Sequence, residues 1–318
     1  MSVKNYSVKQ YQVNDSNNWN AFISKAKNAT FLFHREFMEY HKERFQDFSL
    51  LIFEQEKLLA VIPANRVGDT MYSHQGLTYG GIVYSPKITG EKVAAIIDSL
   101  LAYLKEKGIQ FFYFKPIPSF YAYGGNHEID FFLIKKGALL DKKEMNMAIN
   151  LAMPLTISKS KLKHFRKIED LDLEIVEEDQ LDSFWKLVLE PRLKEKYDAK
   201  PVHTLQEITK LKEKFPNNIK QFSVYCNDEI IAGITIFETD KVVKSQYGAT
   251  TKKGEELRAL DFLFINLIKK YKREDKLFFD MGIVNDSNEK GYHAGLLKQK
   301  EELGCSVYSQ DFYKMNLI

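Results

Sequence analysis

Asp280 is the side chain of this sequence whose position most favours acid–base chemistry. It ends the aromatic run KLFFD and is followed directly by Met-Gly. A charged residue at the exit of a buried strand tends to face a cleft, where a carboxylate can orient a substrate or accept its proton. The same carboxylate could instead cap the loop of residues 282–287. The sequence leaves both interpretations open.

Other polar candidates lie on the preceding strand and in a loop between two predicted helices. Gln246 and Tyr247 are neighbours on a strand, so their side chains point to opposite faces and only one can line a groove. His203 follows Pro201 in the loop. A lone histidine is more often structural than catalytic, and this alternative stands for His203.

A local basic run, SKSKLKHFRK at 158–167, contains five Lys or Arg residues and no acid. Arg166 and Lys167 are its candidates for a phosphate contact, because Arg can bind phosphate bidentately and Lys acts as a point charge. The spacing of these cations spreads them around a helix, which is equally typical of a solvated face.

Composition excludes several classes of protein. With 46 basic and 43 acidic side chains, the net charge of +3 gives no general case for DNA binding. The two cysteines have no CxxC spacing, and no HExxH, P-loop or G-x-S-x-G motif is present, so we expect no metal and no covalent acyl-enzyme. The polar start and the lack of a long apolar run predict a cytoplasmic protein without an integral membrane segment.

The chain repeats one pattern in each half. A long amphipathic helix, a short break and an aromatic strand occupy residues 91–114 and again 255–280, each time after a strand that bears Tyr and Gly. A repeat this long indicates two copies of a domain, because solenoid repeats run at roughly 20–50 residues. We therefore predict an N-terminal domain at 1–151 and a C-terminal domain at 152–318.

The order of elements predicts the class of fold. In the second half, helices at 158–169, 179–195 and 204–214 precede three antiparallel strands, a helix, a strand, a helix and a final strand. The first half matches most of this order, with a hairpin expected near 130–151 in place of the last helix. This is a mixed-sheet α/β (α+β) pattern and not the alternation of a doubly wound sheet.

Seven segments, taken in order, resemble the GNAT acyltransferase fold, and specifically the tandem-GNAT, FemAB-like proteins related to Fem-type peptidoglycan aminoacyltransferases. The match covers nearly all of the second half and is thinner in the first. The segments are YGGIVY (79–84), KLKHFRK (161–167), the proline of AKPVHTLQEITKL, EIIAGITIFE (229–238), SQYGAT (245–250), LFFDMGIVNDSNEKG (277–291) and LLKQKEELG (296–304).

The resemblance implies an acyl-donor site in the C-terminal domain. In the GNAT fold, the loop after the fourth strand of the sheet binds a pyrophosphate, and here that loop is Ala249–Gly254. Glu255 and Glu256 stand where the acetyl-CoA motif has small residues, which brings acyl-CoA into question, with aminoacyl-tRNA as the alternative donor. The cofactor-binding candidates are Thr250, Thr251, Lys253, Gly254 and Arg258.

The resemblance also implies a reaction. We expect an N-acyltransferase that moves an acyl or aminoacyl group to a primary amine of a cell-envelope precursor or amino sugar by direct attack, with Asp280 positioning or deprotonating the amine. The N-terminal domain, with Tyr79, is expected on the acceptor side without a cofactor, and His203 lies in a loop near which the family contacts substrate. The alternatives are a non-catalytic binding protein and a tRNA-dependent Fem-type transferase. The sequence does not predict an oligomeric state.

Overall fold

The computed structural model describes residues 6–169 and 171–318, and the chain forms two compact units. The first unit contains Met1–Glu144 and Ser309–Ile318, and the second contains Met145–Tyr308. The C-terminal end of the chain therefore belongs to the first unit.

Two long strands continue from one unit into the other. They are β9 (Leu139–Asn150) and β15 (Ser306–Asn316). The boundary expected between residues 151 and 152 stays a prediction. The structure assigns residues 145–151 to the second unit.

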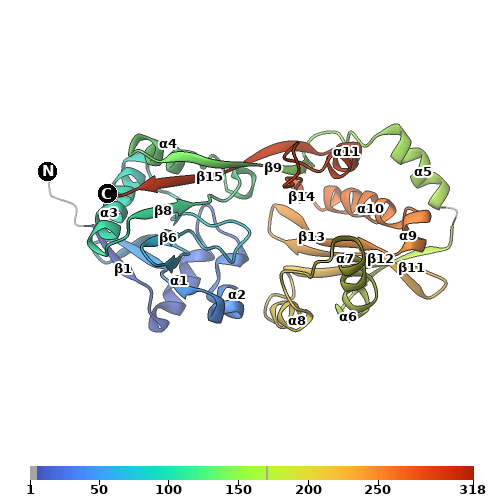
Figure 1. The fold of residues 1–318 in the computed structure, drawn as a ribbon, viewed down its shortest axis with the longest axis horizontal. Helices are drawn as coiled ribbons and strands as arrows, with labels where there is room; N and C mark the ends of the chain where they lie inside the picture. Colours follow the sequence, from blue (N-terminus) through green and yellow to red (C-terminus); the bar gives the residue numbers. More distant parts are fainter. Residues whose placement is uncertain (1–5, 170) are drawn as a thin grey trace. The chain divides into compact units, whose positions relative to one another are not determined.

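The first unit contains two sets of paired strands (Figure 1). One is an antiparallel sheet in the order β1-β3-β4-β7, and the other follows the order β15-β8-β6-β5-β2, in which β6 and β8 run parallel. The strands are β1 (Tyr6–Gln10), β2 (Gln46–Asp47), β3 (Leu50–Glu54), β4 (Lys57–Ile62), β5 (Asn65–Val67), β6 (Thr70–Tyr72), β7 (Val83–Tyr84) and β8 (Phe111–Phe114).

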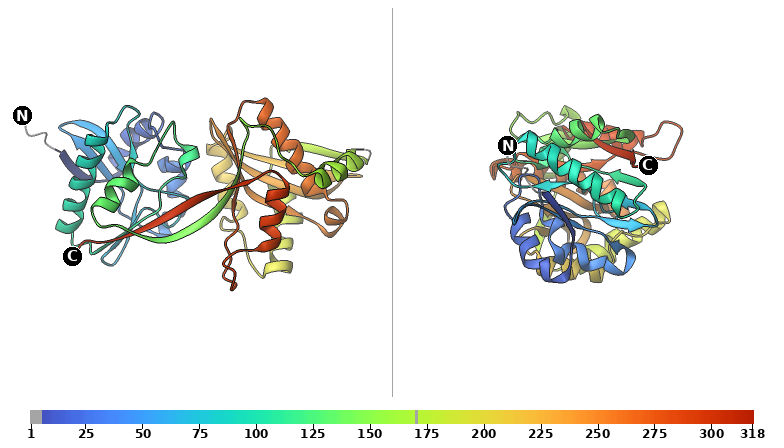
Figure 2. Two further views of the ribbon diagram at one scale, coloured as in Figure 1. Left: turned by 90° about the horizontal axis from the view of Figure 1, so that it is seen from above. Right: turned by 90° about the vertical axis from the view of Figure 1, so that its left-hand side faces the viewer.

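Helix α3 (Gly90–Glu106) supplies one side of the core of this unit. Its apolar residues recur at helical spacing, and they pack with residues of β3, β4 and β8 in one buried cluster. In the right-hand view of Figure 2, α3 runs diagonally in front of the strands. The helix predicted from the repeat at residues 91–107 is therefore the one that packs on β3, β4 and β8.

Residues 128–135 form a helix where the sequence predicted part of a hairpin. Helix α4 (Glu128–Lys135) buries Ile129 and Leu133, which lie one turn apart on a single face. Gly137 follows with φ of +97°, the left-handed conformation that commonly ends helices. The prediction was wrong because a short apolar run does not by itself distinguish a strand from a helix.

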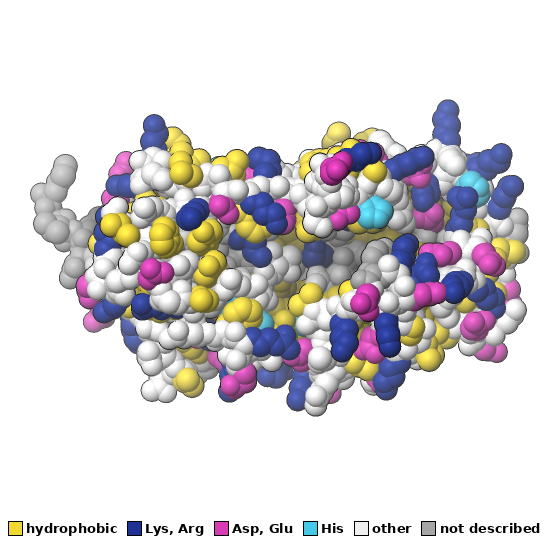
Figure 3. Space-filling view, viewed as in Figure 1, with side chains coloured by type: hydrophobic (Ala, Val, Ile, Leu, Met, Phe, Trp, Pro, Cys, Tyr) yellow, Lys and Arg dark blue, Asp and Glu magenta, His cyan; other side chains and the backbone are white. Residues whose placement is uncertain are grey.

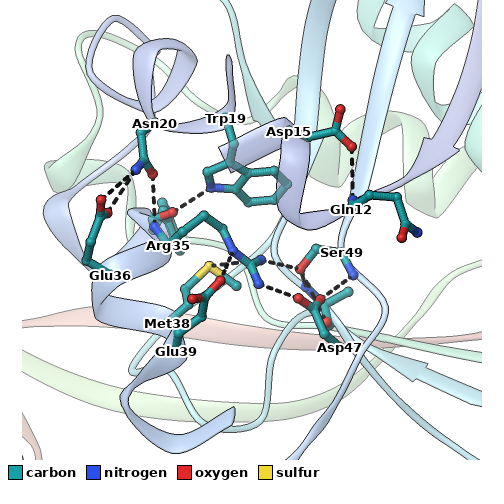
Figure 4. Close-up of polar contacts among 12 residues, drawn as sticks. Gln12, Asp15, Trp19, Asn20, Arg35, Glu36, Met38, Glu39, Asp47 and Ser49 are labelled. Atoms are coloured by element: carbon teal, nitrogen blue, oxygen red, sulfur yellow. Dashed lines mark hydrogen bonds and ion pairs between the residues drawn. The ribbon is translucent and has the colours of Figure 1, made fainter. Parts of the chain in front are cut away.

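A buried arginine joins the small helices of the first unit to its sheet (Figure 4). Arg35, at the start of α2 (Arg35–Met38), forms ion pairs with Asp47 and Glu39, and its Nη1 donates to Ser49 Oγ at 3.2 Å. The guanidinium also stacks 3.8 Å from the centre of the Tyr11 ring. Because a buried charge is costly unless it is paired, these contacts offset the cost of burying Arg35.

The second unit contains a mixed sheet in the order β10-β11-β12-β13-β14-β9. Every pair in it is antiparallel except β13 with β14. Helix α10 lies on one face of this sheet, and α6, α7 and α8 lie on the other (Figure 1). The strands are β10 (Leu173–Glu178), β11 (Ile219–Cys226), β12 (Glu229–Glu238), β13 (Val242–Thr250) and β14 (Phe278–Ile283).

The helices of the second unit follow the predicted order. The one predicted at 179–195 contains a π-helical turn, Trp185–Leu189, and the one predicted from residue 255 divides at Arg258, which has φ of +54°. None of the helices within the described residues has the length and apolar content needed to span a bilayer. The helices are α5 (Lys159–Glu169), α6 (Asp182–Phe184), α7 (Glu190–Tyr197), α8 (Leu205–Lys214), α9 (Lys252–Glu256), α10 (Ala259–Arg273) and α11 (Ala294–Glu302).

His74 of the first unit predicts a pH-dependent stability. Burial lowers the pKa of His74 to about 3, whereas the unfolded chain titrates near its ordinary 6.5. Between these values the unfolded chain binds the proton and the folded chain does not, so this group makes stability fall as the pH falls from 6.5 towards 3. The slope reaches at most about 1.4 kcal/mol per pH unit.

The measurement is urea unfolding of the wild type and His74→Asn across this range. His74 has φ of +60°, a conformation that Asn tolerates well, so the variant should fold and should show a weaker pH dependence than the wild type. His127→Asn removes an exposed imidazole and serves as the control. If the free energy of unfolding depends on pH equally in the wild type and in His74→Asn, the expectation is contradicted.

Candidate functional site

A cavity of about 430 Å³ lies in the second unit where its two parallel strands separate. β13 and β14 are paired only at Val242–Phe278, Val243–Phe279 and Lys244–Asp280. Beyond this point β13 continues beside β12, and its residues from Ser245 onward, except Tyr247, line one wall of the cavity. The volume lies within the roughly 300–1,000 Å³ that is typical of small-molecule sites.

A β-bulge points Gln246 into this cavity. Thr235 pairs with Tyr247 and the next residue of β12 pairs with Ser245, so Gln246 is the extra residue on β13. Gln246 lines the cavity, and its Oε1 is buried without a hydrogen-bond partner among the described residues. Its neighbour Tyr247 packs against the Trp185 ring, with the ring centres 4.9 Å apart.

His203 lies behind the strand and contacts Tyr247. Its Nδ1 is 2.5 Å from the Tyr247 hydroxyl, and its backbone N–H donates to the same oxygen at 3.3 Å. Burial raises the pKa of Tyr247 to about 12, so its hydroxyl stays protonated at neutral pH. This pair fixes the loop before α8 against the strand that forms the cavity wall.

Thr250, the last residue of β13, and Thr251, which follows it, stabilise a tight turn into α9. The Thr251 side chain accepts a hydrogen bond from Gly254 N–H at 3.1 Å, and the Thr250 hydroxyl donates to the Ile231 carbonyl at 3.0 Å. Gly254 is buried because the turn packs directly on β12. Lys253 points elsewhere and forms an ion pair with Glu229 at 2.6 Å.

Charged residues of both signs surround the exposed end of the cavity. Arg192 and Lys196 of α7 and Arg258 line it, as do Glu255 and Asp261. Figure 3 shows Lys and Arg side chains mixed with Asp and Glu on the visible face of the second unit around α7 and α9.

Two residues of the basic run contact residues at this end of the cavity, whereas Arg166 and Lys167, the candidates for a phosphate contact, do not line it. His164 Nδ1 lies 3.2 Å from Arg258 Nη1, and Lys161 forms an ion pair with Asp261 at 2.5 Å. Arg166 and Lys167 are exposed on α5. Helical spacing explains the difference, because only one face of α5 meets α10.

The inner end of the cavity contains a buried ammonium group. Lys300 of α11 is 5% exposed and lines the cavity, and its Nζ donates to the carbonyls of Gly282 at 3.1 Å and Ile283 at 2.9 Å. Burial, with a smaller contribution from the nearby ammonium of Lys244, lowers the pKa of Lys300 to about 8. Lys300 is therefore largely charged at neutral pH.

Asp280 lies next to this ammonium group and is itself buried. Its carboxylate accepts the Gly282 N–H at 2.7 Å and forms an ion pair with Lys244 at 3.2 Å. Gly282 lies within β14, where a bulge interrupts the pairing with β9, so this hydrogen bond stabilises the bulge. The carboxylate also balances the two lysines, and its expected role in catalysis stays a prediction. Met281, the next residue, lines the cavity.

Two further groups, Cys305 beside the cavity and Tyr79 in the first unit, are committed to packing. Burial raises the pKa of the Cys305 thiol to about 12, and its Sγ lies 3.3 Å from the Met281 sulfur, which disfavours Cys305 as a nucleophile. Tyr79 lies in the first unit, where it is 2% exposed and donates to Thr30 Oγ1 at 2.9 Å. No cluster of three metal-binding side chains occurs within residues 6–169 and 171–318.

The cavity lining is charged at one end and apolar further in. Arg192, Lys196 and Arg258 line the exposed end, while Phe264 and Met281 provide apolar surface further in. The cations of α7 were missed in the sequence, because the run EPRLKEKY does not differ from an ordinary solvated helix.

The chain has the tandem-GNAT, FemAB-like fold that its motifs predicted, as solved structures show. FemX has a TM-score of 0.70 with 11% identity over 97% of each chain. A tandem GNAT protein from the clavulanic acid biosynthesis pathway has a TM-score of 0.56 with 7% identity over 99% of each chain.

A third similar structure is the C-terminal domain of a putative lysylphosphatidylglycerol synthetase from Agrobacterium fabrum. Its TM-score is 0.55, with 13% identity over 81% of each chain. No protein-family model matches the sequence, and no curated protein is significantly similar to it. Identities this low establish the fold alone.

The packing of Gly254 leads to a prediction about stability. A Cβ at this position would lie 2.2 Å from both the Ile231 carbonyl oxygen and Thr250 Oγ1. Gly254→Ala should therefore destabilise the protein by about 1–3 kcal/mol, as overpacking does. Urea unfolding measures the loss. Gly125→Ala, where a Cβ meets open space, is the matched control, and equal stability of the two variants would show that the turn can move away from β12.

Proposed function

We propose that this protein is an acyltransferase that moves an acyl or aminoacyl group to a primary amine by direct attack. The observation that carries the proposal is the buried ammonium of Lys300 at the inner end of the cavity where β13 and β14 separate. A fixed positive charge in a site with little water stabilises negative charge that develops on a carbonyl oxygen. An activated thioester or ester, when bound, supplies that carbonyl.

The residues of the chain have separate roles in this proposal. Lys300 stabilises the carbonyl oxygen as its charge develops, and the buried amide of Gln246 orients the acyl group. Asp280 fixes the bulged end of β14 that supplies the carbonyl partners of Lys300. In this proposal no covalent acyl-enzyme is needed. The amine nitrogen attacks the carbonyl carbon, the C–S or C–O bond to the donor breaks, and the donor leaves as its thiol or hydroxyl compound. The proton lost by the amine passes to that leaving group or to solvent.

Two classes of donor fit the proposal. The name of the tandem GNAT structure mentions AcCoA as a ligand that is absent from it, and this supports acyl-CoA as the donor. The similar domain of a putative lysylphosphatidylglycerol synthetase supports an aminoacyl donor. Acyl-CoA would be held by the loop of residues 250–254 and Arg258, and aminoacyl-tRNA is the alternative. For the acceptor we propose the amine of a cell-envelope precursor or amino sugar in the cytoplasm.

The donor class can be tested by thermal unfolding with CoA, acetyl-CoA, aminoacyl-tRNA mimics and UDP-sugars. A ligand that binds the native state raises its stability, by about 2.7 kcal/mol at a hundredfold excess over Kd. A ligand that stabilises the protein is then assayed for acyl transfer to a panel of amines. Binding without transfer to any amine would favour a non-catalytic binding protein.

Lys300→Met should lower kcat by about 100- to 1,000-fold, the effect of removing one group that stabilises an oxyanion. Because the pKa of Lys300 is about 8, the ammonium group loses its charge as the pH rises through 8, and kcat of the wild type should fall with it. This decrease of kcat should be absent from Lys300→Met. Lys298→Met changes an exposed lysine on the same helix and is the control. Unchanged kcat in Lys300→Met would exclude the role.

Asp280→Asn should act through Lys300. The variant removes the negative charge that raises the pKa of Lys300, so the decrease of kcat near pH 8 should shift to lower pH. The rate should fall by about 10- to 100-fold, since hydrogen bonds to charged groups contribute roughly 1.5–3 kcal/mol. The pH profile of kcat separates this positioning role from a loop cap. A loop cap would leave the profile in place, since Asn caps nearly as well as Asp.

A further inference from the structure

Three cations line the exposed end of the cavity, and two of them come from one helix face. Arg192 and Lys196 lie one turn apart on α7, and Arg258 faces the same cavity from the junction of α9 and α10. The Arg192 side chain is only 16% exposed, so its guanidinium is held in place. An ordered guanidinium can bind two oxygens of a phosphate at once.

The carboxylate of Glu255 already contacts this guanidinium. Arg192 Nη2 donates to Glu255 Oε1, and Arg192 Nη1 donates to Glu195 Oε2 at 3.2 Å. Glu195 is bound in turn by Lys252 at 2.6 Å. Glu255 also lines the cavity, and its side chain is 46% exposed, so it can leave Arg192 and turn to solvent.

We propose that Arg192 is the anchor for a diphosphate group and that Glu255 competes with the diphosphate for it. This inference rests on the proposed function, because it concerns the substrate of the same cavity. A phosphate oxygen and a carboxylate oxygen use the same N–H donors of a guanidinium, so one can replace the other. Glu195 keeps Arg192 oriented while Glu255 is displaced.

The competition makes Glu255 a determinant of specificity. A ligand with one weak negative charge gains little by replacing a carboxylate that already neutralises Arg192. A diphosphate gains more, because it also meets Lys196 and Arg258 at the same end of the cavity. The site therefore discriminates by charge, and a diphosphate could come from a CoA donor or from a nucleotide-sugar acceptor.

The test is isothermal titration calorimetry of the full-length protein with inorganic pyrophosphate, CoA and UDP-N-acetylglucosamine. Glu255→Gln keeps the size of the side chain and removes its charge, so it should tighten diphosphate binding by about 5- to 10-fold, the order expected when an exposed ion pair no longer competes. Glu256→Gln changes an adjacent exposed carboxylate and should leave the affinity unchanged.

A second variant, Arg192→Gln, removes the guanidinium that is proposed to bind the diphosphate. It should weaken binding at least 10-fold, and adding Glu255→Gln to it should give no further gain, because the two residues act through one contact. Tightening for CoA identifies the diphosphate as that of the donor, and tightening for UDP-N-acetylglucosamine identifies it as that of the acceptor. Both outcomes support the anchor.

Equal or weaker binding in Glu255→Gln would overturn the proposal, as would equal gains in the Glu255 and Glu256 variants. Failure of all three ligands to bind any variant would overturn it too. None of these results depends on acyl transfer, so the proposed function is decided separately by the Lys300→Met assay. Thermal unfolding of each variant shows whether a loss of binding reflects a loss of fold.

Discussion

The early end of parallel pairing between β13 and β14 is the constraint on which the candidate site depends. After Lys244 and Asp280 the strands separate, so backbone groups at the facing edges lose their sheet partners while still lying near the core. Buried backbone groups are nearly always hydrogen-bonded, so other elements must supply the partners. The Asp280 carboxylate accepts the Gly282 N–H, and Lys300, which lines the cavity, donates to the carbonyls of Gly282 and Ile283.

The same constraint accounts for the charges at the inner end. Burying Lys244, Asp280 and Lys300 together has a large desolvation cost, and a single unpaired charge there would be worse. One carboxylate and two backbone carbonyls compensate the two ammonium groups. Burial lowers the pKa of Lys300, and the neighbouring ammonium of Lys244 lowers it further. A cavity that faces this charge favours substrates that become negative there.

The fold was predictable from the sequence because long amphipathic helices and aromatic strands repeat in both halves. Asp280 was chosen because a carboxylate ends an apolar run, and the loop of residues 250–254 because of the resemblance; their roles in a site stay predictions. The bulge at Gln246 was not predictable, since strict alternation along a strand gives no signal of an extra residue. Arg192 and Lys300 were missed as cavity residues for another reason. Their helices carry many lysines and acids, and only tertiary packing selects the ones that face inward.

In the first unit, the backbone groups at the ends of two parallel strands obtain their hydrogen-bond partners in a different way. There β6 and β8 run parallel from Thr70–Phe111 to Tyr72–Tyr113, and the chain after β6 turns back to bind the end of β8. Gly80 N–H donates to the Lys115 carbonyl at 2.8 Å, and Lys115 Nζ donates to the Leu77 carbonyl at 2.7 Å.

Close approach of the backbone makes this arrangement possible. A Cβ on Gly80 would lie 1.8 Å from the Ser73 carbonyl oxygen, so only glycine permits it. In this unit the chain itself provides the partners that the strand ends need, and a lysine stands where β14 has Asp280. Two copies of one arrangement can thus diverge through a few residues at the strand ends, because these residues decide whether the gap is filled by the chain or left as a cavity.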